Sequence, residues 1–400
     1  MEKRLKIAFI HPDLCIGGAE RLIIDTAIDM QNMGHKVVIF TSRYSNDYCF
    51  KNLQYVNINI REYGGKLPLN VKGRLRAPCT ILRMTYISIA LLLSKYSPDI
   101  VFCDIVPHIL PLIRFFSKSK IIYYCHYPDS LMTPVRNIFY NIYRYPIDKL
   151  ELFGLKFSDK ILVNSKFTAN AFRDTFPGLA VTVLYPSIDL SRFTLSVDYT
   201  EQKSYSNFYS ELIILSLNRF DPNKNLEMLL YTLSELKHCV EPSVFNRVHL
   251  IIAGAFDKKL SECLFILNKL KYLSINLGLK DKVEFQISLS DKACINLLQR
   301  SSCLLYTSLN EHFGIGIIEA MAAGKPVVAV NKGGPLEIIT SQKTGFLCDP
   351  NPKAFALAVA EILSNPDKAD IIGKAGQKKV AETFSRERFG KKLKGIIKSL

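Results

Sequence analysis

The sequence contains 10 cysteines in 400 residues, but no two of them form a Cys-x-x-Cys pair, with two residues between them. Without a Cys-x-x-Cys pair, neither a cysteine-rich zinc site nor a dithiol redox site is predicted. Several cysteines stand inside predicted strands, among them Cys103, Cys125 and Cys303. A buried free thiol behaves there as a small apolar side chain. We therefore expect a reducing compartment and no structural metal.

The chain is also short of acidic residues and of long apolar runs. It has 36 acidic residues against 52 Lys and Arg, a formal net charge of +16. This excess predicts an anionic partner, which can be nucleic acid, an anionic membrane surface or a phosphorylated substrate. No run reaches the roughly 18 uninterrupted apolar residues of a membrane-spanning helix. The apolar run at the N-terminus is too short for a signal peptide, so residues 7–10 are expected to form a first strand.

The overall composition is that of a globular protein, and the order of its patterns predicts an α/β fold. With 48% hydrophobic and 22% charged residues, the chain is long enough for two cores. Strand and helix patterns alternate throughout, which predicts parallel sheets covered by helices. The expected strands are residues 7–10, 35–41, 99–104, 121–126, 160–165, 181–186, 211–217, 248–254, 283–288, 303–308, 326–330 and 345–348.

A polar stretch without periodicity separates these strands into two sets. We predict an N-terminal domain at 1–190, a linker at 191–210 and a C-terminal domain at 211–384, followed by a basic amphipathic helix at 385–400. Each set has enough strands for its own open sheet. Because ligands bind beyond the carboxyl ends of strands in open sheets, two facing sheets would place the active site between the domains.

The segment Glu311–Val330 contains two acids, Glu311 and Glu319, with a glycine-bearing loop between them. Gly314 and Gly316 allow the backbone to approach a ligand closely or to adopt positive φ. The apolar residues that follow predict a short buried helix containing Glu319, with Glu311 at its mouth. Such a helix start favours an anionic ligand, and the two acids can accept hydrogen bonds from ribose and sugar hydroxyls. The alternative is two solvated acids near a tight turn.

Two further loops follow predicted strands. Gly17 and Gly18 open an amphipathic helix, an arrangement that can form an anion-binding nest or be a plain loop. Arg219 and Lys224 flank a turn set by Asp-Pro-Asn at 221–223. The guanidinium and the ammonium can then reach the same pyrophosphate, although an exposed basic turn would have the same pattern.

Three polar residues end strands of the N-terminal half. His126 ends the strand at 121–126, His11 follows the first strand, and Asp104 ends the strand at 99–104. The carboxyl edge of a parallel sheet is where ligands bind, although a single histidine is usually structural.

Together these motifs resemble the family 4 retaining glycosyltransferases, which have the GT-B fold. The two acids of 311–319 match the family's Glu, seven residues, Glu signature, and NKGGPLEII at 331–339 and TGFLCDP at 344–350 fit the same family. The resemblance covers nearly the whole chain. It implies two Rossmann-like domains facing each other across a cleft, with the final helix crossing back to the first domain.

The resemblance also implies roles for single residues. Glu319 would hold the nucleotide ribose and Glu311 the hydroxyls of the transferred sugar. Arg219 and Lys224 would neutralise the leaving diphosphate, and His126 would orient the sugar. Backbone amides would support the donor. The remaining donor-binding residues are then Gly17, Gly18, Phe313, Gly314, Ile315 and Gly316, while His11 and Asp104 would line the acceptor side.

The sequence contains no Asp-x-Asp, the pair with which glycosyltransferases commonly hold nucleotide diphosphate through a metal. Arg219 and Lys224 would replace the metal, so no metal requirement is expected. We find no well-placed second carboxylate for a double displacement. Departure and attack on the same face, with retention, is what the family implies.

Within the family, HPDLCIGGAERLIID, YYCHYPDSLMTP and VLYPSID resemble the eukaryotic mannosyltransferases of dolichol-linked oligosaccharide assembly. That resemblance implies GDP-mannose as donor and a dolichyl-diphosphate-linked GlcNAc2Man acceptor, which receives alpha-1,3 and alpha-1,6 mannoses in N-glycan precursor synthesis. It places the protein on the cytosolic face of the endoplasmic reticulum, attached peripherally or monotopically, in complexes with other early-pathway glycosyltransferases. The chain departs from the pattern at Gly314–Ile318, where relatives often carry a proline.

Residues 66–95 contain six basic residues and no acid, and within this stretch the apolar run TILRMTYISIALLL at 80–93 follows the basic cluster. This pattern predicts a helix that lies on an anionic membrane, with Arg74, Arg76 and Arg83 contacting lipid. A second basic and aromatic patch occupies 136–144. The alternative for either patch is a buried helix with a solvated basic face.

Two rival functions remain at this point. One is a family 4 transferase that uses a UDP-sugar. The other is a non-catalytic basic protein that binds nucleic acid, which would need base-stacking aromatics interleaved with its cations on one surface. The basic residues are instead divided between a turn and an apolar-flanked patch, so no nucleic-acid partner is expected.

Overall fold

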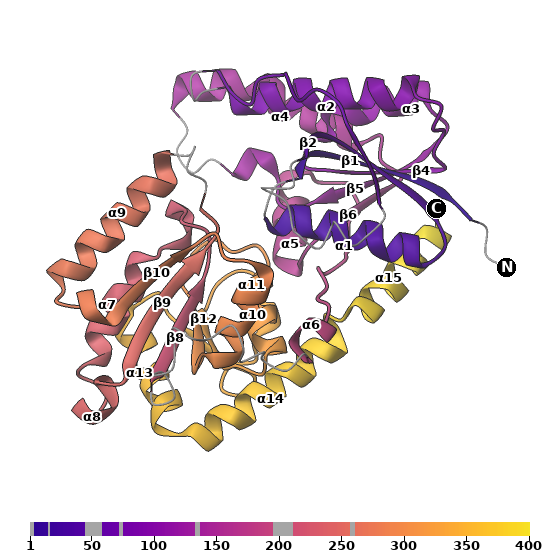
Figure 1. The fold of residues 1–400 in the computed structure, drawn as a ribbon. Coiled ribbons are helices and arrows are strands. Elements are labelled where there is room, and N and C mark those ends of the chain that lie inside the picture. Colours follow the sequence, from indigo (N-terminus) through magenta and orange to yellow (C-terminus); the bar gives the residue numbers. More distant parts are fainter. Residues whose placement is uncertain are drawn as a thin grey trace. The chain divides into compact units, whose positions relative to one another are not determined.

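The computed structural model describes residues 4–14, 17–44, 58–71, 75–132, 137–194, 211–256 and 261–400. The chain forms two compact units (Figure 1). Unit 1 contains Met1–Ser187 and Glu387–Leu400, and unit 2 contains Ile188–Arg386. Each unit holds one parallel sheet between layers of helices. The predicted linker begins with a short helix, α6 (Ser191–Thr194), and its residues 195–210 lie outside the described residues.

The sheet of unit 1 has seven parallel strands in the order β3-β2-β1-β4-β5-β6-β7. Six of them occur where strands were expected, and β3 is additional. The order makes β4 the neighbour of both β1 and β5, although α1, β2, β3 and α2 lie between β1 and β4 along the chain. The strands are β1 (Lys6–Leu14), β2 (Lys36–Tyr44), β3 (Asn59–Glu62), β4 (Ile100–Asp104), β5 (Lys120–Cys125), β6 (Lys160–Val163) and β7 (Thr182–Val183).

Both faces of this sheet are apolar because successive strand side chains point to opposite sides. Ile10 and Cys103 belong to the core beneath α2, α3, α4 and α5, whereas Phe9 and Phe102 belong to the core beneath α1 and α15. The two helix layers are visible in Figure 1. The helices are α1 (Gly18–Asn32), α2 (Arg76–Leu93), α3 (Leu110–Phe116), α4 (Ile138–Leu155), α5 (Lys166–Thr175) and α15 (Arg386–Lys398).

The sheet of unit 2 has six parallel strands in the order β10-β9-β8-β11-β12-β13. Its strands are β8 (Leu212–Leu217), β9 (Val248–Gly254), β10 (Val283–Ile287), β11 (Cys303–Tyr306), β12 (Val327–Val330) and β13 (Phe346–Cys348). Its helices are α7 (Glu227–Leu236), α8 (Pro242–Phe245), α9 (Ser261–Asn276), α10 (Asp291–Arg300), α11 (Ile315–Ala322), α12 (Pro335–Ile338), α13 (Pro352–Ser364) and α14 (Pro366–Thr383). The core on one face joins α7, α9 and α13 to the strands.

A buried carboxyl group lies on the inner side of α4 in unit 1. The side chain of Glu151 is 2% exposed, and its Oε1 accepts a hydrogen bond from the backbone N–H of Asp129 at 3.1 Å. Burial, followed by the negative charge of Asp129, raises the pKa of Glu151 to about 7. The folded chain therefore binds a proton at Glu151 in a pH range where the unfolded chain has released it.

This difference predicts that Glu151→Gln has a higher free energy of unfolding than wild type at pH 8. The gain over wild type should be smaller at pH 5. Stability falls with rising pH where the folded state binds more protons, here between about 4.5 and about 7. A shift of this size corresponds to about 3 kcal/mol at most. Thermal melts from pH 5 to pH 8 measure the gain. The exposed control Glu382→Gln should show no such trend, and a gain independent of pH would contradict the prediction.

Candidate functional site

The loop between β11 and α11 in unit 2 is shaped by glycines. Gly314 has a φ of +111° and directly precedes α11, so a side chain there would strain the backbone. The Gly333-Gly334 turn packs against the same loop: an added Cβ on Gly334 would lie 2.3 Å from the carbonyl oxygen of Phe313. The N–H of Gly334 also donates to the carbonyl of Glu311 at 2.8 Å. The GGP motif therefore holds the backbone of the acid-bearing loop in place.

Glu311 is the centre of a polar cluster formed by this loop, β11 and the 218–225 turn. Its Oε2 accepts hydrogen bonds from Lys224 Nζ and from the Tyr306 hydroxyl, each at 2.7 Å. The ammonium of Lys224 also lies 5.8 Å from the centre of the Tyr306 ring. Burial would raise the pKa of Glu311, but Lys224 and the hydrogen bonds outweigh it and lower that pKa. The acid is thus held ionised beside a cation.

The turn that carries Arg219 and Lys224 is fixed on several sides. Asp221 accepts from the N–H of Asn223 at 2.9 Å, as the Asp-Pro-Asn motif predicts. Thr307 Oγ1 donates to the carbonyl of Lys224 at 2.9 Å. The two cations differ in surroundings, because Lys224 is 17% exposed and turned toward Glu311, whereas Arg219 is 60% exposed. Arg219 is therefore the cation more open to solvent.

Glu319 lies in α11, as predicted, and its side chain is 23% exposed. Arg192 of α6 approaches it, with Nη1 4.0 Å from Glu319 Oε1 and Nη2 3.2 Å from Asp291 Oδ2. The side chain of Phe313 is buried and packs edge-on against Phe384 at 5.6 Å. Only the backbone of Phe313 is thus open to the donor role predicted for it.

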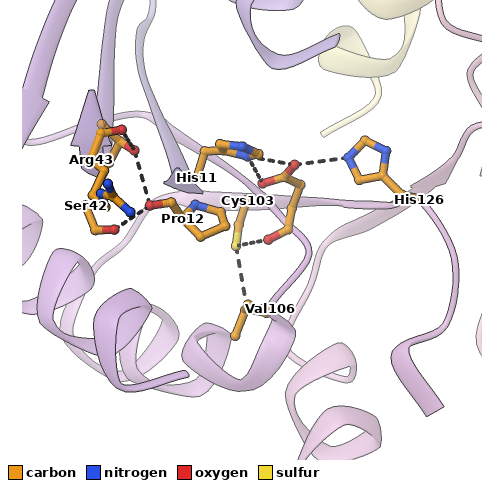
Figure 2. A network of polar contacts seen from close by, with 9 residues as sticks. His11, Pro12, Ser42, Arg43, Cys103, Val106 and His126 are labelled. Carbon is orange, nitrogen blue, oxygen red and sulfur yellow. Dashed lines mark hydrogen bonds and ion pairs between the residues drawn. The ribbon is translucent and has the colours of Figure 1, made fainter. Parts of the chain in front are cut away.

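A second polar cluster lies at the carboxyl ends of β1, β4 and β5 in unit 1. The carboxylate of Asp104 accepts from His11 Nδ1 at 2.8 Å and from His126 Nε2 at 3.0 Å. The rings of His11 and His126 lie on either side of these contacts (Figure 2). His11 and Asp104 are fully buried, whereas His126 is 23% exposed. The prediction that His11 and Asp104 line the acceptor side is therefore wrong for direct contact, and His126 is the member open to solvent.

The surroundings shift the pKa values within this cluster. Burial alone would lower the pKa of His11, but the charge and hydrogen bond of Asp104 raise it above its usual value. Burial would raise the pKa of Asp104, yet the two histidines lower it. Both shifts favour an ionised Asp104 paired with a charged His11.

The predicted glycine nest at the start of α1 contains an acid of its own. A Cβ added to Gly17 would lie 2.2 Å from Oε2 of Glu20, so the carboxylate of Glu20 already occupies the space beside Gly17. Gly18 is exposed as the first residue of α1. A phosphate that binds here must displace this carboxylate.

The predicted lipid contact of Arg83 is wrong. Arg83 is 3% exposed, and its Nη1 donates to Asp13 Oδ2 at 2.6 Å and to Ser42 Oγ at 2.9 Å. Arg83 lies on the inner side of α2, where it pairs with the end of β1. Arg76 is exposed at the start of α2, and Arg74 and Arg136 lie outside the described residues.

The chain matches known proteins along nearly its whole length. Residues 16–192 match Glycosyltransferase Family 4, and residues 198–379 match Glycosyl transferases group 1. The alpha-1,3/1,6-mannosyltransferase ALG2 of Homo sapiens is 38% identical over 98% of this chain and 96% of the human protein. The protein of the same name from Dictyostelium discoideum is 35% identical over 100% of this chain and 99% of its own. The chain belongs to the alpha-1,3/1,6-mannosyltransferase family.

Solved structures agree with this family on the fold. A glycosyltransferase from Rickettsia africae ESF-5 superposes with a TM-score of 0.76 at 25% identity, covering 100% of this chain and 99% of its own. Sucrose-phosphate synthase from Thermosynechococcus elongatus gives a TM-score of 0.78 at 19% identity, covering 99% of both chains. The predicted GT-B fold and the prediction of a glycosyltransferase are thus confirmed.

Two residues of the polar clusters were not identified from the sequence. Tyr306 has the pattern of a core strand residue, and Arg192 lies in the segment predicted as linker. Nothing in their sequence neighbourhood marks either one, because each acts through a contact that only the fold creates.

Proposed function

We propose that this mannosyltransferase transfers mannose from GDP-mannose, with retention, to a dolichyl-diphosphate-linked GlcNAc2Man acceptor, adding the alpha-1,3 and alpha-1,6 mannoses of the N-glycan precursor. The observation that carries the proposal is the contact of Lys224 with Glu311 and Tyr306 at the glycine-bearing loop, in a chain of this family. A fixed cation beside a fixed carboxylate suits a donor that combines a diphosphate with a sugar.

In this proposal each polar group has one task. Glu311 accepts hydrogen bonds from mannose hydroxyls, and Lys224 and Arg219 stabilise the negative charge that develops on the leaving GDP. Glu319 accepts from the ribose hydroxyls, and the free N–H groups of Ile315 and Gly316 at the start of α11 support the donor. His126 orients the mannose.

The donor is tested with a panel of GDP-mannose, UDP-glucose and UDP-N-acetylglucosamine offered to the purified full chain. We expect turnover with GDP-mannose at least tenfold above that with either UDP-sugar. The runner-up function, a family 4 transferase with a UDP donor, predicts the reverse order. Binding of RNA without any transfer would instead favour a basic nucleic-acid-binding protein.

Turnover should survive treatment with EDTA. Among the described residues, no group of three or more His, Cys, Asp and Glu could hold a metal ion. Lys224 and Arg219 supply the positive charge that a metal would otherwise provide. The measurement is the rate with GDP-mannose before and after chelation and after adding back Mn²⁺ or Mg²⁺. A rate that is lost with EDTA and restored by either ion would contradict this assignment.

We further propose that unit 1 docks on the cytosolic face of the endoplasmic reticulum through the outer sides of α2 and α4. Both helices pack against the turn Pro107–Ile109, and α3 contacts both. We call their exposed apolar residues the α2–α4 face: Leu82, Tyr86, Ile89, Leu93, Ile138, Phe139, Ile142, Tyr145, Leu150 and Phe153. Lys149 is exposed beside it, with its ammonium 5.5 Å from the Tyr145 ring centre, and α2 contains no acid.

An apolar face with a basic residue beside it and no acid on α2 is typical of a helix in the interface of an anionic bilayer. α2 is also, by length and composition, the one helix of the described residues that could cross a membrane, although 33% of it is buried. Its inner side, with Met84 and Ile87, belongs to the core of unit 1. An interfacial position therefore suits α2 better than a spanning one.

The double variant Phe139→Ser/Ile142→Ser should bind anionic liposomes at least tenfold more weakly than wild type. Each exposed side chain that enters the bilayer contributes about 1.5–3 kcal/mol, and neither contributes to the core. Flotation measures binding, and an unchanged melting temperature shows that the fold is intact. The matched control Leu357→Ser/Ile371→Ser removes two exposed apolar side chains of unit 2. Equal flotation of the two double variants would remove the α2–α4 face from the account.

A further inference from the structure

The described residues leave one buried polar cluster whose members the proposed reaction uses only in part. His11 and Asp104 are fully buried, away from solvent, and only His126 is available to a substrate. Yet both buried residues are polar, and burying them is costly unless they are paired. Their arrangement therefore calls for an explanation beyond packing.

The carboxylate of Asp104 holds both histidines at once. It accepts from His11 Nδ1 at 2.8 and 2.9 Å and from His126 Nε2 at 3.0 Å. An ionised carboxylate only accepts hydrogen bonds, so the nitrogen of each ring that faces it must carry a proton. In a neutral His126 the other nitrogen, Nδ1, then has a free lone pair.

The backbone around the cluster is held in an unusual conformation. Ile105, which follows Asp104, has a φ of +61°, a conformation that a β-branched residue rarely adopts. The carbonyl of His126 accepts from Asn164 Nδ2 at 3.0 Å, and its ring lies 5.0 Å from that of Tyr124. Both ends of the Asp104–His126 contact are thus fixed by neighbouring elements.

His11 has a further feature that packing alone does not explain. Its Nε2 is buried and has no hydrogen-bond partner among the described residues. The ring therefore makes its polar contacts only through Nδ1, to Asp104. A buried histidine with one bonded nitrogen is well placed to keep the adjacent carboxylate ionised and fixed in position.

We infer that Asp104, supported by His11, is a positioning residue that fixes His126 with its proton on Nε2, so that Nδ1 accepts a hydrogen bond from a hydroxyl of the transferred sugar. The inference rests on the proposed role of His126 and adds the reason for its orientation. Tautomer choice through the second nitrogen is a general way in which proteins set the role of a histidine.

The test is ¹⁵N NMR of the full chain labelled at histidine, which distinguishes the protonated from the unprotonated ring nitrogen. The resonances of His126 are assigned by their absence in His126→Gln. We expect wild-type His126 with Nε2 protonated and Nδ1 unprotonated. A wild-type His126 with its proton on Nδ1 would overturn the inference, whatever the variants do.

The variant Asp104→Asn keeps the size of the side chain but offers one acceptor oxygen in place of a carboxylate. We expect the ¹⁵N shifts of at least one of the two histidines to change and kcat to fall roughly 10- to 100-fold, with KM for GDP-mannose changed less than threefold. The control is Asp99→Asn. Asp99 directly precedes the first residue of β4, and its side chain accepts a hydrogen bond from the N–H of Lys6. The control should leave the histidine resonances and kcat unchanged. Unchanged histidine resonances in folded Asp104→Asn would overturn the inference.

The proposed function is judged separately, by transfer from GDP-mannose in wild type. If wild type transfers mannose but its His126 has the wrong tautomer, the positioning inference fails and the function stands. If His126 has the expected tautomer but wild type transfers only from a UDP-sugar, the function fails and the positioning of His126 stands.

Discussion

Lys224→Ala should lower kcat by at least a hundredfold and also lower the melting temperature. The rate falls because a preorganised cation aimed at the leaving diphosphate is typically worth about 3 kcal/mol. Stability falls because Glu311, only 15% exposed, loses the ammonium that lies 2.7 Å from its Oε2. Removing one partner of a buried ion pair leaves an uncompensated charge and costs up to about 3–5 kcal/mol.

Two matched variants separate these effects. Arg219→Ala should lower kcat about a hundredfold without changing the melting temperature, because Arg219 is 60% exposed. Lys269→Ala removes a lysine that pairs with Glu227 at 2.6 Å on the surface of unit 2. It should change stability by less than about 1 kcal/mol and leave kcat unchanged. If both Arg219→Ala and Lys224→Ala retain turnover near that of wild type, the diphosphate role of this turn is wrong.

Gly254→Ala should destabilise unit 2 by about 3 kcal/mol, the upper end of the usual cost of overpacking, and abolish donor binding. Gly254 ends β9, and an added Cβ would lie 1.8 Å from the carbonyl oxygen of Asn218. That contact is with backbone, so no side chain can move aside. Either β9 must shift or the turn that carries Arg219 must be displaced.

Urea denaturation and calorimetric titration with GDP-mannose measure the two effects. Gly395→Ala is the control, because an added Cβ there meets nothing within 4 Å and Gly395 lies in the helix α15. Alanine in a helix is favoured over glycine by about 1 kcal/mol, so this variant should be slightly more stable than wild type. A Gly254→Ala protein as stable as wild type would show that the end of β9 is not packed as described.

The layered α/β fold was predictable because both sheets are buried on two faces. Their strands appear in the sequence as short apolar runs, such as 99–104 and 303–308, separated by helical periodicity. The additional strand β3, Asn59–Glu62, was missed because its sequence NIRE has no such run. It pairs with β2 at the edge of the sheet.

The position of Arg83 was predicted wrongly because the basic residues were counted without regard to helix faces. Cys79, Arg83 and Ile87 are spaced four apart and all lie on the buried side of α2. The helical period therefore contained the signal that places Arg83 inside. What the sequence could not show is its partner, Asp13, which only the pairing of α2 with the end of β1 brings near.

The histidine cluster shows the same limit. His11, Asp104 and His126 were each recognised at the end of a strand, but their mutual contact depends on the strand order β1-β4-β5. The apolar patterns of the sequence locate the strands but do not reveal their order in the sheet. The contact of Tyr306 with Glu311 was missed for a similar reason, because a tight turn rather than a helical spacing brings them together.

The measurement that tests the central claim most directly is mass analysis of the products formed by the purified full chain from GDP-mannose and a synthetic dolichyl-diphosphate-linked GlcNAc2Man acceptor. The account predicts products heavier by one and by two hexose residues, which an alpha-mannosidase removes. An acceptor that stays unchanged with GDP-mannose but gains a sugar from UDP-glucose or UDP-N-acetylglucosamine would contradict it.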